Sequence, residues 1–282
     1  MSALADLKEL IDRRAVIGQF VGAELKSGHR DKLLGNLWQL IDPLALMFVY
    51  YVVWSLVLGR RPPDFMAYIL SGIITFQMFQ GSVVGSSTVL RSQVRLIREV
   101  YFPKSALPTA ITLARLYDFL WALFALGLVL VVLLYRQAHW VPGPGMPAIK
   151  HPLAFGWNAL WLPAAALVLL TFSLGFAYMF AVAGALFRDT PNILQFVFRM
   201  WFYLSPMFYY GDERTVTGNV VFHLFYRLNP FTHLFRMVRN ALIYNRPPTL
   251  DGTVYVVGVS VAVLVFGFWL FSRCEGTVVK QL

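Results

Sequence analysis

The side chains best suited to chemistry in this sequence are aromatic rings that recur at helical spacing in two segments. Residues that repeat at intervals of three and four positions share one face of a helix. Tyrosine and tryptophan combine flat apolar faces with hydrogen-bonding edges, which suit sugar rings that pass without tight binding. We therefore predict two faces that line a path, and the alternative is helix packing or lipid contact. The first stripe is Met47, Tyr50, Tyr51, Trp54 and Leu58, and the second is Phe198, Trp201, Phe202, Ser205, Phe208 and Tyr209.

Ionisable side chains inside apolar stretches are a second set of candidates, because a charge at membrane depth is costly. Arg115 and Asp118 are three positions apart and can neutralise one another, so we expect a structural pair. Arg199 could contact an anionic group of a substrate or bind the C-terminal end of a helix. Asp42 could cap the helix that Pro43 begins, or it could meet a neighbouring cation.

Self-contained catalysis is not expected from this chain. The sequence has no Gly-rich phosphate loop, no His-Glu-x-x-His and no Gly-x-Ser-x-Gly, and its five histidines are scattered. The single cysteine, Cys274, excludes an intramolecular disulfide and a cysteine-based zinc cluster. We predict a chain that is not an enzyme and holds no metal or cofactor. Any ATP and magnesium would then be bound by a separate ATPase subunit.

The composition places these side chains in a membrane. Of the 282 residues, 58% are hydrophobic and only 13% are charged, whereas an average soluble domain has roughly 25% charged residues. The formal charge of +10 suits anionic lipid headgroups, so membrane lipids rather than nucleic acid are the expected partner. At about 20 apolar residues for each crossing, the chain has no room for a sizeable soluble domain.

Six long apolar stretches predict an all-α integral membrane fold with six transmembrane helices. Residues 1–36 carry cations between short apolar groups, so we expect a cytoplasmic interfacial amphipathic segment there and one six-helix domain over 37–282. Lysine and arginine gather on the side of the two termini, which places both termini in the cytoplasm. The six stretches are 37–58, 65–90, 106–135, 153–186, 192–210 and 253–272.

The region between the fifth and sixth stretches, residues 211–250, does not fit the count of crossings. It is too polar to cross a membrane, yet residues 220–226 and 231–244 are too apolar for an open loop. Two short re-entrant helices fit this pattern, with Asn229 and Pro230 as the turn between them. We expect a cap over a polar path. The alternative is a pair of amphipathic helices that lie on the outer leaflet.

A basic amphipathic segment, about 91–104, separates the second and third stretches. Such a segment suits docking into a groove of a cytosolic partner, and the alternative is an inert basic loop that satisfies the charge bias. The residues that we expect to couple to the partner are Arg91, Arg95, Arg98, Glu99, Tyr101, Phe102 and Pro103.

Three further motifs carry a family resemblance. They are Leu-Ile-Arg-Glu-Val-Tyr-Phe-Pro-Lys-Ser-Ala-Leu-Pro at 96–108, Phe-Arg-Asp-Thr-Pro at 187–191 leading into Trp-Phe-Tyr-Leu-Ser-Pro at 201–206, and Leu-Asn-Pro-Phe-Thr at 228–232. Together they resemble the permease subunit of ABC-2 type polysaccharide exporters, which include the O-antigen, capsule and teichoic-acid export permeases. The resemblance begins near residue 30, and the 139–152 loop has no family-specific match.

The resemblance implies a homodimer bound to two copies of an ABC ATPase subunit in the bacterial cytoplasmic (inner) membrane. It implies export of a polysaccharide attached to a polyprenyl-pyrophosphate lipid. Residues 91–104 would form the coupling helix, 212–247 the outer gate helices, and the first and fifth spans the border of the conduit. Other classes stay open: an ABC-2 exporter of a drug or small lipid, an ATP-independent secondary transporter or channel, and a membrane enzyme.

Overall fold

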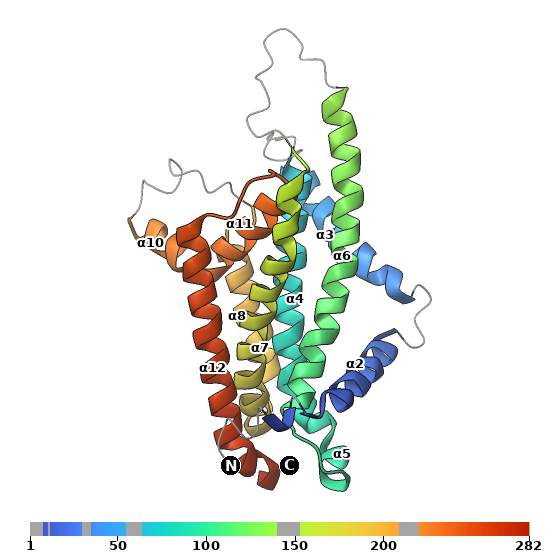
Figure 1. Cartoon of the computed structure of the whole chain (residues 1–282), viewed down its shortest axis with the longest axis vertical. Coiled ribbons are helices and arrows are strands. Elements are labelled where there is room, and N and C mark those ends of the chain that lie inside the picture. Colours follow the sequence, from blue (N-terminus) through green and yellow to red (C-terminus); the bar gives the residue numbers. More distant parts are fainter. Residues whose placement is uncertain are drawn as a thin grey trace.

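In a computed structural model of the chain, the secondary structure of the described residues is helical (Figure 1). No β-strand occurs within them, in agreement with the all-α prediction. Leu58 and Tyr209, the last members of the two aromatic stripes, lie outside the described residues, as does most of the 139–152 loop. The described ranges are 8–10, 12–29, 35–54, 64–139, 153–208 and 220–281.

Four helices in the described part of the chain are long and apolar enough to cross a bilayer. They correspond to the second, third, fourth and sixth predicted stretches. The third of these crossings begins at the 3-10 helix η3 (Trp157–Trp161), which continues directly into α7. The four helices are α4 (Phe65–Ser92), α6 (Ala106–Ala138), α7 (Leu162–Leu186) and α12 (Leu250–Gln281).

The helices at the first and fifth predicted stretches are shorter. α3 (Trp38–Val52) and α8 (Thr190–Leu204) have 15 residues each, which is about 22 Å at the usual rise of an α-helix and less than the roughly 30 Å of a hydrocarbon core. α8 ends where Ser205 turns extended before Pro206, since the residue before a proline disfavours helix. The count of six crossings therefore stays a prediction.

The long helices run side by side along the longest axis of the molecule (Figure 1). α5 (Val94–Glu99), α2 (Arg14–His29) and the C-terminal end of α12 lie toward one end. α10 (Val220–Leu228) and α11 (Pro230–Leu242) lie toward the other end. The predicted interfacial segment, the basic segment and the chain terminus thus share an end, and the predicted gate lies opposite.

Small residues, and hydroxyl groups that hydrogen-bond within their own helix, allow the central helices to pack closely. Ser71 and Thr75 are buried on α4 and donate to backbone carbonyls of the preceding turn, so neither needs a partner outside its helix. A Cβ added at Gly184 of α7 would lie 1.8 Å from the carbonyl oxygen of Ser87. A Cβ at Gly267 of α12 would lie 2.1 Å from the carbonyl oxygen of Gly175 on α7. Because no side chain fits at either crossing, α7 packs at backbone contact with α4 and with α12.

Candidate functional site

The two aromatic stripes meet where the C-terminal halves of α3 and α8 approach one another. The ring of Tyr50 lies 4.5 Å from that of Phe208 and 6.3 Å from that of Phe202, measured between centroids. Its hydroxyl lies 3.3 Å from the hydroxyl of Tyr203, the residue after Phe202 on α8. Two segments about 150 residues apart in sequence thus form one aromatic surface.

Several stripe residues are nevertheless packed inside the chain. Met47 and Phe198 are buried, and Phe198 lies 5.1 Å from the ring of Phe79 on α4. Trp54 is partly buried against Phe65, 5.2 Å away between ring centroids, and Tyr51 and Trp201 pack against the same core. These contacts match the helix-packing alternative. The buried residues support the aromatic surface and do not line it in this conformation.

The open faces of α3 and α8 carry a set of residues that the stripe spacing missed. These residues lie between the stripe positions, so both helices are apolar around most of their circumference. In such a helix the spacing of apolar residues does not identify the face that points outward. Arg199 is exposed on this side of α8. The large exposed hydrophobic residues are Trp38, Ile41, Leu46, Phe48 and Val49 on α3, Val53 just after it, and Ile193, Phe196, Val197, Met200, Tyr203 and Leu204 on α8.

Asn229 makes the central hydrogen bonds of the predicted turn between the two short helices. It is 4% exposed, and its side-chain oxygen accepts hydrogen bonds from Trp201 Nε1 and from the backbone N–H of Phe231, both at 3.1 Å. Its amide nitrogen donates to Ser205 Oγ at 3.0 Å. Pro230 is the first residue of α11, where its missing N–H costs nothing. One buried amide therefore caps α11 and fastens it to the end of α8.

Arg239 on α11 is a functional candidate that sequence reasoning missed. Its side chain is 5% exposed and donates from Nη1 to the carbonyl of Pro206 at 3.0 Å and from Nη2 to the carbonyl of Tyr68 at 3.1 Å. Its Nε lies 3.3 Å from Ser71 Oγ, and the guanidinium stacks 3.4 Å above the Tyr68 ring. Arg239 thus joins α11, the start of α4 and the segment after α8.

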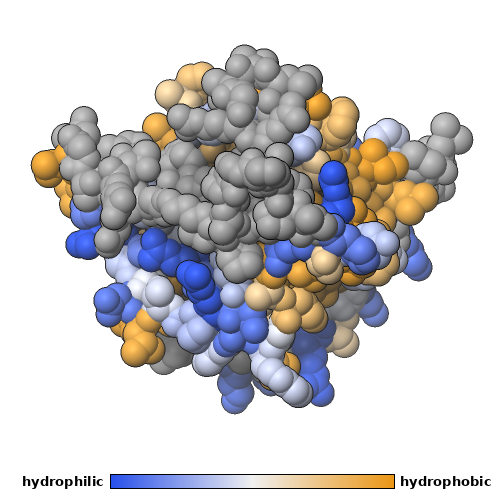
Figure 2. Space-filling model, turned by 90° about the horizontal axis from the view of Figure 1, so that it is seen from above, coloured by the Kyte–Doolittle hydropathy of each residue, from blue (hydrophilic) through white to orange (hydrophobic). Residues whose placement is uncertain are grey.

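Two further contacts fix the C-terminal end of α11. The Tyr244 hydroxyl donates to the buried carboxylate of Asp64 at 2.7 Å. Asn158 of η3 donates from its side chain to the Asn245 carbonyl at 2.9 Å, and Asn245 adopts a left-handed backbone with φ of 47°. Figure 2 views the molecule from this end, where hydrophobic and hydrophilic residues both reach the surface.

The predicted coupling segment divides into an exposed part and an anchored part. Arg95 and Glu99 form an ion pair of 2.9 Å on α5, and the Arg95 side chain is 90% exposed. Arg98 is also exposed, and Tyr101 is 68% exposed. These four side chains can meet a partner without any change in the fold.

The remaining members of the segment hold it in place. Arg91 donates to the carbonyl of Ala185 at the end of α7, at 3.0 and 3.3 Å. Phe102 and Pro103 are buried. Lys104 forms a 3.2 Å ion pair with Glu275 of α12. The segment is therefore tied to the ends of two long helices.

The predicted pair in the third stretch is present, with Arg115 Nη1 lying 2.8 Å from Asp118 Oδ2. The prediction that Asp42 caps a helix begun by Pro43 is wrong, because α3 begins at Trp38 and both residues lie within it; Asp42 is exposed. In the described ranges, no three histidine, cysteine, aspartate or glutamate side chains are grouped so that they could hold a metal ion.

Comparison with known proteins decides the family. Residues 17–243 match the family described as ABC-2 type transporter, and this range contains the aromatic surface, the coupling segment and α11. The chain belongs to the ABC-2 type transporter family. Together with its long apolar helices, this membership makes the chain a multi-pass membrane protein.

Three relatives of this ABC-2 chain have names that state a cargo. The O-antigen export system permease protein RfbA of Myxococcus xanthus is 27% identical over 258 residues, or 92% of either chain. The protein of the same name from Klebsiella pneumoniae is 23% identical over 67% of this chain and 66% of its own length. The polysialic acid transport protein KpsM of Escherichia coli is 22% identical over 74% of either chain.

Proposed function

We propose that this chain is the permease subunit of an ABC transporter that exports a lipid-linked polysaccharide across the bacterial inner membrane. The similarity to the Myxococcus xanthus O-antigen export permease over 92% of both chains carries this proposal. The E. coli relative is named for polysialic acid transport, which extends the likeness to a second glycan. The lipid carrier in the proposal is polyprenyl pyrophosphate.

The driving force in this proposal comes from two copies of an ABC ATPase subunit bound to a homodimer of the permease. Membership of the ABC-2 family supports a partner ATPase, and the exposed side chains of α5 offer a surface on which it could dock. ATP and magnesium would be held by that partner. Both termini would face the cytoplasm, on the side of α5.

The proposed path runs along the aromatic surface of α3 and α8. Tyr50 and Tyr203 present hydroxyl groups beside ring faces, a combination that binds sugars weakly enough for release. The conduit residues in the proposal remain Met47, Tyr50, Tyr51, Trp54, Phe198, Arg199, Trp201, Phe202, Ser205 and Phe208, of which the buried members act by positioning the others.

The outer gate in this proposal is the pair α10 and α11. Asn229 links α11 to α8 through Trp201 and Ser205, so a displacement of α8 would be passed to the gate. Such a link supports a gate that opens only when α8, beside the proposed path, moves.

Loss of the gene tests the cargo. If the proposal holds, cells without this permease accumulate lipid-linked glycan on the cytoplasmic side of the membrane, and the wild-type gene restores export. The second candidate function is export of a drug or small lipid. Family membership alone, without the named relatives, supports it. It predicts normal surface glycan and intracellular retention of a small molecule, a result that would contradict the polysaccharide proposal.

A further inference from the structure

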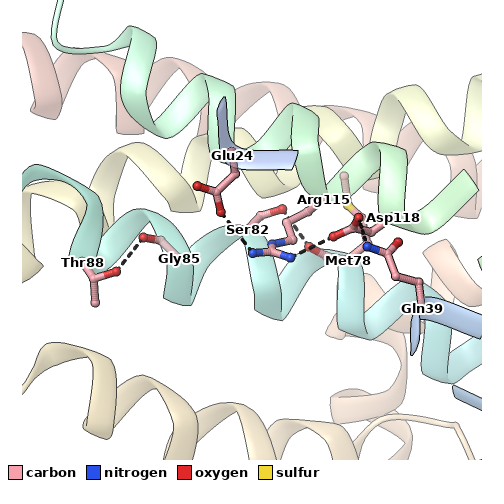
Figure 3. Close-up of polar contacts among 8 residues, drawn as sticks. All are labelled: Glu24, Gln39, Met78, Ser82, Gly85, Thr88, Arg115 and Asp118. Atoms are coloured by element: carbon pink, nitrogen blue, oxygen red, sulfur yellow. Dashed lines mark hydrogen bonds and ion pairs between the residues drawn. The ribbon is translucent and has the colours of Figure 1, made fainter. Parts of the chain in front are cut away.

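Arg115 joins three helices through its carboxylate partners (Figure 3). On α6, its Nη1 pairs with Asp118. Its Nη2 lies 3.3 Å from Glu24 Oε1 on α2. Asp118 in turn accepts a hydrogen bond from Gln39 in the first turn of α3. A single polar cluster therefore connects α2, α3 and α6.

The surroundings of Arg115 suit a fixed connection between these helices. Arg115 is the tenth residue of α6, so it lies about 14 Å along the helix axis from its start, where an unpaired charge would be costly in a membrane. Gly81 on α4 makes room for the arginine, because a Cβ at that position would lie 3.0 Å from Arg115 Cδ. The guanidinium is held between two carboxylates that come from different helices.

The N-terminal half of α2 and the residue just before it hold the coupling segment. The ring of Phe20 lies 5.1 Å from that of Phe102 between centroids. Arg13 donates to the carbonyl of Tyr101 at 3.1 Å, and its guanidinium lies 5.1 Å from the centre of the Tyr101 ring. A helix that only rested on a membrane surface would need none of these contacts.

We propose that α2 is a strut that transmits movement of the coupling segment to α3, with Glu24, one turn after Phe20, as the positioning residue. A displacement at Tyr101 and Phe102 shifts α2 through Arg13 and Phe20. Glu24 passes the shift through Arg115 and Asp118 to Gln39, and thus to the helix that carries the proposed path. This inference rests on the proposed ATP-driven function.

The strut predicts a variant that assembles but transmits poorly. Glu24→Gln removes one carboxylate and leaves the Arg115 and Asp118 pair intact and neutral, so the fold should persist. Phe20→Ala weakens the contact with Phe102 without a change in charge. The matched control is Lys26→Gln, which also changes the charge by one on α2 but alters an exposed side chain.

An environment-sensitive fluorophore on α3 measures the transmission. Because Cys274 is the only cysteine, a Cys274→Ser background with Phe48→Cys gives a single label on an exposed position of α3. The permease and its copurified ATPase are placed in nanodiscs, and the fluorescence change on adding ATP, magnesium and vanadate is recorded. We expect the change in Glu24→Gln and Phe20→Ala to fall below half of that in Lys26→Gln, with ATP hydrolysis rate and subunit stoichiometry unaltered.

The outcomes separate the two claims. Equal fluorescence changes in Glu24→Gln and Lys26→Gln would overturn the strut and leave the proposed function standing. No nucleotide-dependent change in the labelled parent would overturn the ATP-driven function and the strut with it. Should Glu24→Gln fail to assemble, Phe20→Ala decides by the same comparison.

Discussion

Arg239 gives the clearest test at the scale of a single residue. Its planar guanidinium reaches two carbonyls and a hydroxyl while it stacks on Tyr68. Lysine keeps the charge but cannot make this set of contacts. We expect Arg239→Lys to lower the stability by roughly 1–3 kcal/mol, as for a buried group that loses its hydrogen bonds.

The thermal unfolding midpoint in detergent measures this effect. Arg236→Lys is the matched control, because Arg236 is only partly buried and makes a longer 3.4 Å contact with Tyr226. A midpoint for Arg239→Lys equal to that of the control would show that the buried contacts of Arg239 contribute little.

His233 gives a residue-scale prediction about pH. Its Nε2 donates to the Arg227 carbonyl at 2.9 Å, which leaves Nδ1 bare, and Nδ1 is buried with no partner in the described part of the chain. Burial lowers the pKa of His233 below its usual 6.5 by more than the hydrogen bond to Arg227 raises it, and the nearby Arg236 also lowers it. The unfolded chain therefore binds the proton more readily than the folded chain does.

Stability should accordingly fall as the pH drops through about 6.5, the value of the unfolded group. We expect the unfolding midpoint of His233→Gln to fall less than that of the wild type when the pH is lowered from 7.5 to below about 6.5. Parallel losses in the two proteins would assign the acid sensitivity to other groups.

Residue-scale prediction from sequence worked where the partners are close in the chain. Arg115 and Asp118 could be paired from their spacing, whereas Glu24 and Gln39 could not, because they come from helices whose packing on α6 no local pattern encodes. Arg236 and Arg239 are likewise three residues apart, and spacing gives no means of knowing which one is buried.

At the scale of elements, the crossing of α7 and α12 depends on glycine. Gly267→Ala would place a methyl group 2.1 Å from the Gly175 carbonyl oxygen, so the helices would have to separate. Helix–helix association in membranes relies on such close packing. We expect Gly267→Ala to lower the unfolding midpoint by several degrees.

Gly258 provides the control on the same helix. A Cβ at that position meets nothing within 4 Å in the described part of the chain, and alanine favours helix over glycine. Gly258→Ala should therefore leave the midpoint unchanged or raise it slightly. If the two variants unfold at the same temperature, the glycine crossing does not determine the packing of α12.

The charge of α5 carries the second element-scale prediction. Arg95 and Arg98 are exposed, and they would face an acidic or polar groove of the partner ATPase. Reversal of both to glutamate should abolish copurification of the ATPase and with it export, while Arg95→Lys with Arg98→Lys should retain both. Undiminished ATPase binding by the charge-reversed protein would refute the docking role of α5.

The elements themselves were predicted to different degrees. The four long helices follow from apolar length, and the α10 to α11 break follows from Asn229 and Pro230. The sequence predicts a fifth stretch that continues to residue 210, because the residues after Leu204 stay apolar. In the structure α8 ends at Leu204, because Pro206 interrupts the helix. Apolar composition gives the length of a hydrophobic stretch and does not say where the helix within it stops.

At the scale of the whole molecule, the described parts of the chain form an unbroken series of contacts from one end to the other. The coupling segment contacts α2, α2 contacts α6, and α6 contacts α3. The α3 surface meets α8, which Asn229 links to α11. An ATPase docked at α5 could therefore act on the opposite end through this chain's own side chains.

Reconstitution tests the central claim that this chain is a path powered by another subunit. Lipid-linked polysaccharide would be placed on the outer face of proteoliposomes in which the ATPase side also faces outward, and its transfer to the lumen would be measured. We expect transfer only when permease, partner ATPase, ATP and magnesium are all present. Transfer by the permease without the ATPase or ATP would contradict the account.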